Sequence, residues 1–153
     1  MNNNLSEVFQ NANLLNRYKE ICEIFNDFPN RMKDVSMKDI ISIFNEIGLG
    51  DFNKTGGFFS LVCSFSNIES VLNITTKGGL VEPFLYIKID GITQTPNGRL
   101  DFISEELDGS FDRTKYNLAK YTSLQELKVI MISLLSIYWN VNYKLIKSLP
   151  SGS

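Results

Sequence analysis

The stretch from Gly57 to Glu105, GFFSLVCSFSNIESVLNITTKGGLVEPFLYIKIDGITQTPNGRLDFISE, decides the fold of this chain. Apolar and polar residues alternate along most of it, which is the pattern of half-buried β-strands. Glycine, proline and asparagine interrupt the alternation at short intervals, as hairpin turns require. The stretch therefore predicts a four-stranded antiparallel meander.

Each predicted strand has one apolar face, which we expect to meet the core. The strands are Phe58–Ser66, Ser70–Thr76, Phe84–Gln94 and Arg99–Ser104. Their core faces are predicted to carry Phe59, Leu61, Cys63, Phe65, Leu72, Ile74, Leu85, Ile87, Ile89, Leu100 and Phe102. Ile92 has the opposite parity to Ile89. We therefore expect a β-bulge near Asp90-Gly91, which would let both isoleucines face the same core.

The second face of the predicted sheet is only partly polar, since Phe58, Val62, Val71, Phe84 and Tyr86 lie on it. Either helices cover part of this face, or it offers a partly apolar contact surface. We expect helices over its middle and exposure at one edge.

Helices are predicted on both sides of the meander. Apolar spacings of three and four indicate a helix from Asn4 to Asp27 and a shorter one from Ser36 to Ile47 that Gly48 ends. Ser123 and Glu126 form a capping box that starts a strongly apolar helix from Ser123 to Lys147. The fold class is α+β, with two N-terminal helices and the long C-terminal helix packed on the sheet. Residues 1–150 form one predicted domain, and 151–153 a flexible tail.

The glycine-rich segment from Gly48 to Gly57 resembles two ligand-binding loops but satisfies neither pattern. A phosphate-binding loop needs glycine directly before Lys54-Thr55, where Asn53 stands. A calcium-binding loop that begins at Asp51 needs glutamate at its twelfth position, where Val62 stands. We interpret the segment as a connecting loop.

The amino-acid composition argues against several classes of function. The 153 residues include 15 basic and 17 acidic side chains, a net charge of −2, which argues against a general nucleic-acid binder. With no histidine, histidine-based triads and dyads cannot form, and a zinc site is not expected. Cys22 and Cys63 are predicted to be buried free thiols of a reducing compartment. The N-terminus lacks a signal-peptide pattern, and the apolar run from Val129 to Trp139 is too short to cross a membrane. We expect a cytoplasmic protein without a cofactor, metal or membrane contact.

Five acidic residues gather late in the chain: Asp101, Glu105, Glu106, Asp108 and Asp112. They are consistent with a solvated loop, a carboxylate metal site, a pair of glycosidase carboxylates or an acidic surface that docks on a basic partner. We take the docking surface forward. The predicted partner-binding residues are these five acids together with Phe84 and Tyr86 on the second sheet face.

In overall build the chain resembles the immunity proteins of bacterial polymorphic toxin and contact-dependent growth inhibition systems. The resemblance lies in its length, its acidity, the strands GGFFSLVCSF and EPFLYIKIDG and the acidic loop after Phe102. It implies a non-enzymatic cytoplasmic protein, a monomer or weak dimer, that neutralises one cognate toxin with a basic surface. The alternatives are a type III secretion chaperone that binds an effector segment, and a small carboxylate-dependent enzyme.

Overall fold

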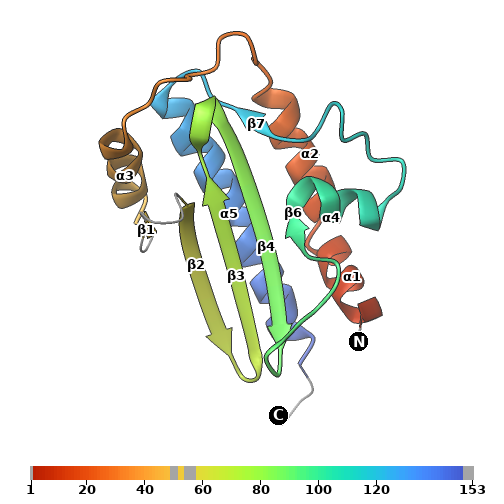
Figure 1. Ribbon diagram of the computed structural model, residues 1–153. Coiled ribbons are helices and arrows are strands. Elements are labelled where there is room, and N and C mark those ends of the chain that lie inside the picture. Colours follow the sequence, from red (N-terminus) through yellow and green to blue (C-terminus); the bar gives the residue numbers. More distant parts are fainter. Residues whose placement is uncertain (1, 49–51, 54–57, 150–153) are drawn as a thin grey trace.

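The computed structural model of the protein describes residues 2–48, 52–53 and 58–149 (Figure 1). It is an α+β fold, as the sequence predicts. The helices are α1 (Asn2–Asn11), α2 (Leu14–Ile24), α3 (Met37–Glu46), the 3-10 turn η1 (Lys77–Gly79), α4 (Leu100–Leu107) and α5 (Leu124–Lys147). The strands are β1 (Phe52–Asn53), β2 (Phe58–Phe65), β3 (Ile68–Thr75), β4 (Leu80–Ile89), β5 (Ile92–Thr93), β6 (Gly98–Arg99) and β7 (Ala119–Lys120).

The sheet is antiparallel and centres on the long hairpins of β2, β3 and β4. Its order is β1-β2-β3-β4-β5, and β6 and β7 also pair with β4. The free edge of β4 is thus closed by three short strands in turn: β7 at Leu80 and Val81, β6 at Phe84 and Leu85, and β5 at Lys88 and Ile89. Such short pairings protect a strand edge from association with another chain.

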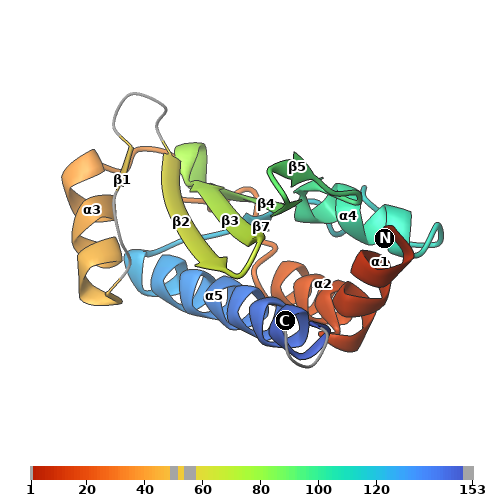
Figure 2. The ribbon, with the colours of Figure 1, turned by 90° about the horizontal axis from the view of Figure 1, so that it is seen from below.

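The molecule has two layers, with helices on one side of the sheet (Figure 2). α5 runs beneath the strands, and α1 and α2 lie beside it. The core lies between the layers: Phe59, Leu72, Ile74, Leu85 and Ile87 of the sheet are buried against the inner face of α5. Burying one such side chain stabilises the fold by about 1.5–3 kcal/mol.

The predicted C-terminal helix is confirmed, and so is its cap. The Ser123 hydroxyl accepts a hydrogen bond from the Glu126 amide at 3.1 Å, while the Glu126 carboxylate accepts from the Thr122 amide at 2.8 Å. At mid-helix the Tyr138 hydroxyl donates to the Ser70 carbonyl oxygen at 2.7 Å, which ties α5 to β3. By length and composition alone α5 could cross a membrane, a property that the core helix of a soluble protein shares.

The single N-terminal helix predicted from Asn4 to Asp27 is wrong, because the segment forms α1 and α2 with a break between them. The break is at Asn13, whose backbone is left-handed with φ of 56°. Asparagine tolerates this conformation better than most residues. Apolar spacing continues across the break, and so the sequence pattern does not reveal it. The helix that Ser36 caps is confirmed.

The bulge predicted at Asp90-Gly91 is also wrong. Asp90 and Gly91 have φ of 54° and 78°, and Ile89 pairs directly with Ile92. Two successive positive φ values define the tight two-residue hairpin that Asp-Gly favours. β4 therefore ends at Ile89. Ile92, its cross-strand partner, lies on the same sheet face as Ile89 but is 66% exposed at the end of the hairpin.

The fourth predicted strand, Arg99–Ser104, is a further correction, because α4 begins at Leu100. Leu100, Ile103 and Ser104 are buried on one helical face, whereas Phe102, predicted to face the core, is 45% exposed. Of the predicted connecting loop from Gly48 to Gly57, Phe52 and Asn53 form β1, while 49–51 and 54–57 lie outside the described residues, as does the predicted tail 151–153.

Candidate functional site

Asp101 is the buried centre of an ion cluster and is not part of the acidic surface on which the sequence places it. Its side chain has no solvent exposure. Arg99 donates to both of its oxygens, Nε to Oδ1 at 2.7 Å and Nη2 to Oδ2 at 2.9 Å. Arg113 Nε donates to Oδ2 at 3.2 Å. Asp101 is therefore enclosed by two arginines and cannot contact a partner.

The two arginines extend the cluster to the surface. Arg99 Nη1 lies 3.0 Å from Glu82 Oε2 of β4, and Arg113 Nη1 lies 3.7 Å from Glu105 Oε1 of α4. The hydrogen bonds from Arg99 to Asp101 raise the pKa of the guanidinium above its ordinary value. Through its two arginines, which are always charged, the cluster thus joins the sheet, α4 and the following loop.

Phe102 is an exposed aromatic ring held by these arginines. The Arg113 guanidinium carbon is 3.6 Å from the ring centroid, and that of Arg99 is 5.0 Å away. Cation–π contacts of this kind restrain the orientation of the ring. Sequence reasoning missed Phe102, Arg99 and Arg113 as site residues, because the segment was interpreted as a strand.

The exposed acids divide into two groups. Glu105 and Glu106 are exposed on α4, three and four residues after Phe102 and therefore on the same side of the helix. Asp108 and Asp112 lie in the loop that follows, where hydrogen bonds from the Ser110 side chain and amide lower the pKa of Asp108. Those from Thr114 lower the pKa of Asp112 in the same way. Both carboxylates thus stay ionised and brace tight turns.

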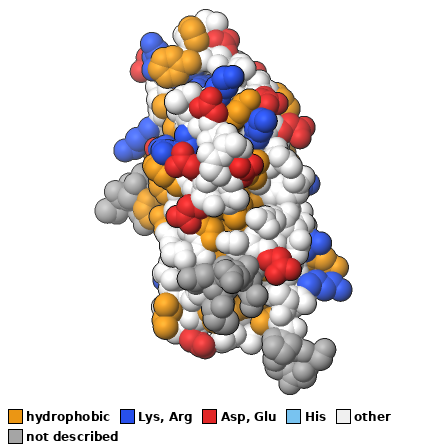
Figure 3. All heavy atoms as spheres, turned by 90° about the vertical axis from the view of Figure 1, so that its right-hand side faces the viewer, with side chains coloured by type: hydrophobic (Ala, Val, Ile, Leu, Met, Phe, Trp, Pro, Cys, Tyr) orange, Lys and Arg blue, Asp and Glu red, His pale blue; other side chains and the backbone are white. Residues whose placement is uncertain are grey.

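The acidic surface is less uniform than the sequence suggests. Figure 3, which faces the side of the molecule that carries α4 and the loop, shows acidic and basic side chains interspersed. Lys19 and Lys115 line the same hollow as Asp108 and Asp112. The hollow that Asp108 and Asp112 line is therefore of mixed charge, whereas Glu105 and Glu106 lie outside its lining.

Phe84 and Tyr86 lie on the outer sheet face, in rows that the register defines. Ser60, Asn73, Phe84 and Arg99 form one row, and Val62, Val71 and Tyr86 the next. The expected helical coverage of this face is wrong for the described residues, since Figure 2 shows the helices beneath the sheet and beside it. Phe84 and Tyr86 are half-buried, each next to a cross-strand neighbour in its row.

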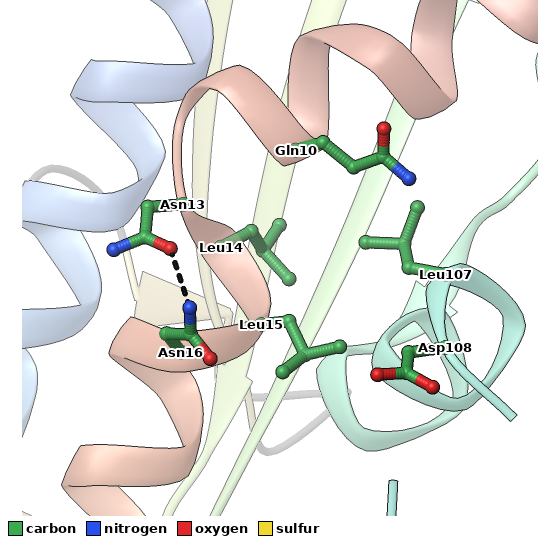
Figure 4. A pocket seen from close by; sticks show the side chains of 7 residues that line it. All are labelled: Gln10, Asn13, Leu14, Leu15, Asn16, Leu107 and Asp108. Atoms are coloured by element: carbon green, nitrogen blue, oxygen red, sulfur yellow. Dashed lines mark hydrogen bonds between the residues drawn. The ribbon is translucent and has the colours of Figure 1, made fainter. Parts of the chain in front are cut away.

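A hollow between the α1–α2 break and the end of α4 was not anticipated (Figure 4). It encloses about 320 Å³ and is lined by Gln10, Asn13, Leu14, Leu15, Asn16, Leu107 and Asp108. Asn16 Nδ2 donates to Asn13 Oδ1 at 2.9 Å across its wall. Amide side chains and leucines give it polar and apolar sides but no assembled reactive group.

The cysteines are free, as predicted, with Cys22 buried and Cys63 half-buried. Within residues 2–48, 52–53 and 58–149, no cluster of three or more cysteine or carboxylate side chains is placed to hold a metal ion. The side chains brought together around Phe102 can bind and orient a partner by charge and by aromatic contact.

Comparisons with protein-family models, with curated proteins and with solved structures give no match to this chain.

Proposed function

We propose that the protein is a toxin-neutralising binding protein of the immunity type. Its contact surface in this proposal, the β4–α4 surface, consists of Phe84, Tyr86, Phe102, Glu105 and Glu106. The single observation that carries the proposal is the exposed ring of Phe102, which contacts two arginines and stands beside exposed carboxylates.

Pre-organisation is the physical reason for choosing this surface. A ring that is already oriented loses little conformational entropy on binding, and aromatic anchors account for much of the binding energy at protein interfaces. Glu105 and Glu106 add the charge that accelerates association with a basic partner.

The buried Asp101 supports the same proposal. Desolvation of a buried ion cluster often offsets its Coulombic gain, so apolar side chains of similar volume would stabilise the fold equally well. The cluster does, however, hold Arg99 and Arg113 against the ring of Phe102. A rigid exposed aromatic is useful to a protein that recognises another surface.

The test uses the candidate toxin encoded directly beside the gene for this chain. Co-expression of this chain should restore the growth of cells that make the toxin. Phe102→Ala should weaken the complex by about 2 kcal/mol, roughly 30-fold in Kd, in calorimetry. E105K/E106K should slow association and reduce its salt dependence.

E23K/D34K is the matched control, because it makes the same charge change at exposed positions of α2 and the loop after it. It should leave association unchanged. Equal effects of the two double variants would show only a net-charge effect and would remove the β4–α4 surface from the proposal. If F102A still protected cells fully from the toxin and bound it with unchanged affinity, the β4–α4 surface would likewise be removed from the proposal.

The secretion chaperone is a second candidate, favoured by the outer edge of β2. Within the described residues β1 pairs with Phe58 and Phe59 alone, and beyond them Val62 is exposed. An effector segment could add a strand there. Under this alternative the neighbouring gene encodes a secreted effector, and Val62→Lys abolishes binding while E105K/E106K does not.

A further inference from the structure

The outward face of α5 carries a regular stripe of five apolar residues and one serine, all of them exposed. Its positions follow one another at spacings of three, four, three, four and three residues: Val129, Ile132, Ser136, Trp139, Tyr143 and Ile146. All six are exposed, Ile132 by 48% and Trp139 by 52%. At 1.5 Å per residue the stripe is about 26 Å long. Figure 2 shows α5 on the side of the molecule away from the sheet.

This spacing is the a/d repeat of a helix that packs against another helix. The core positions of α5, among them Leu127, Ile130 and Leu134, lie on its inner face and do not account for the stripe. A long apolar seam that stays exposed on a monomer indicates an interface. The occupant that fits a heptad seam is an α-helix.

We infer that the occupant is α5 of a second copy of this chain, antiparallel to the first about a two-fold axis between Ile137 and Tyr138. About this axis each stripe position of one copy lies opposite a stripe position of the second copy, and the two residue numbers of every such pair have the same sum. Trp139 then faces Ser136 of the second copy, where the small side chain leaves room for the indole. Tyr143 faces Ile132, and Ile146 faces Val129. One surface is thus complementary to itself, as a two-fold dimer requires.

The polar positions on one side of the stripe match in the same arrangement. The residue that directly follows the second apolar position of each heptad flanks the stripe on one side. In an antiparallel pair, such residues of one helix lie near the equivalent flanking residues of the other helix. Here Lys147 approaches Glu126 of the second copy, and Asn140 approaches Ser133. Opposite charges at such flanking positions select partner and orientation. A parallel pair in register would instead bring Lys147 towards position 142 of the second copy, an asparagine, and would leave it without an opposite charge.

A hollow of about 400 Å³ between α2 and α5 can accommodate the large side chains of Trp139 and Tyr143 from the second copy. Its apolar lining includes Ile21, Ile24, Val129 and Ile132. Ile24 is 62% exposed there. In the antiparallel pair this end of the stripe meets the end that carries Trp139 and Tyr143 of the second copy. Large side chains at one end and a hollow at the other are what one self-complementary surface needs.

The test measures the mass and the fluorescence of the full chain against concentration. Light scattering should show the mass rising from 17.4 kDa to twice that value. The chain has one tryptophan, so its emission reports on Trp139 alone and should shift to shorter wavelength over the same concentration range. Trp139→Glu should raise the dimer dissociation constant by roughly 30-fold or more. Val62→Glu, the same kind of change on the outer sheet face, should leave it unchanged.

Cysteine pairs test the orientation. A mixture of V129C and I146C should form a disulfide-linked dimer under mild oxidation, while either variant alone, like the parent protein, should not. A constant mass of 17.4 kDa at every concentration overturns the inference. So does a dimer that V62E breaks and W139E does not. Sedimentation of the monomer with phosphatidylcholine–phosphatidylserine vesicles, without self-association, would assign the stripe to a lipid surface instead.

Discussion

Asp101 shows how one residue changes meaning between sequence and structure. Among five acidic residues it looks like one more surface charge, yet it is the one that Arg99 and Arg113 enclose. It lies on α4, one turn before Glu105. Helical spacing alone would not have separated Asp101 from Glu105, because residues four apart lie on the same helical face. The two acids differ because Arg99 and Arg113 enclose Asp101, while the Glu105 side chain is 48% exposed.

Asp101→Asn should therefore destabilise the fold strongly. The substitution leaves two arginine charges beside a neutral amide, and removing one partner of a buried ion pair costs about 3–5 kcal/mol. Urea unfolding measures the change. Glu106→Gln, which alters an exposed carboxyl of the same helix, should stay within about 0.5 kcal/mol of the parent protein. Equal losses for both variants would contradict the role of Asp101.

Cys22 predicts a loss of stability in alkali. Burial raises the pKa of its thiol from 9.0 to about 12, and burial also raises the pKa of the Tyr18 hydroxyl. The folded chain keeps protons that the unfolded chain releases. Stability is thus fully present below pH 9.0 and declines as pH rises from there toward 12. The urea concentration at the unfolding midpoint should decrease as the pH is raised from about 8.5 to about 11. In Cys22→Ala this decrease should be smaller, and the stability at pH 7 should be lower than that of the parent protein.

At the scale of elements, sequence periodicity predicted the long regular helices and strands. It missed the breaks and turns that depend on the backbone conformation of a single residue. The strands β2 and β3 and the helices α3 and α5 were found because their apolar spacing is regular over many residues. The α1–α2 break depends on one left-handed residue, Asn13, which the spacing does not register. Of the candidate site, the sequence analysis named Glu105, Glu106, Phe84 and Tyr86 as partner-binding residues. Its arginines and Phe102 were missed, because a short segment fits a strand or a helix equally well.

The hairpin between β4 and β5 depends on one glycine conformation. Gly91 has φ of 78°, and a Cβ added there would meet no atom within 4 Å, so the cost of Gly91→Ala is backbone strain alone. We expect a loss of about 1–2 kcal/mol in thermal or urea unfolding. Gly109→Ala is the matched control, because Gly109 also has open space around it and its backbone is not in the left-handed region. A neutral G91A variant would show that the turn tolerates other conformations.

At the scale of the whole molecule, the two proposed surfaces lie on opposite layers. The β4–α4 surface opens on the sheet side, and the stripe of α5 lies on the helical side (Figure 2). The core between them is shared, but no residue belongs to both surfaces. A dimer built through α5 would therefore present two partner-binding surfaces that face away from each other.

This arrangement predicts that dimer formation and partner binding are independent. W139E, monomeric under the dimer proposal, should bind the candidate toxin with a Kd per chain within about twofold of the parent, because sites without shared partners act additively. F102A should conversely leave the dimer dissociation constant unchanged while it weakens toxin binding. Calorimetry and light scattering on both variants measure the two equilibria separately. If W139E also weakened toxin binding without losing helical content, the second copy would contribute to the toxin site, and the β4–α4 surface of one chain would be only part of it.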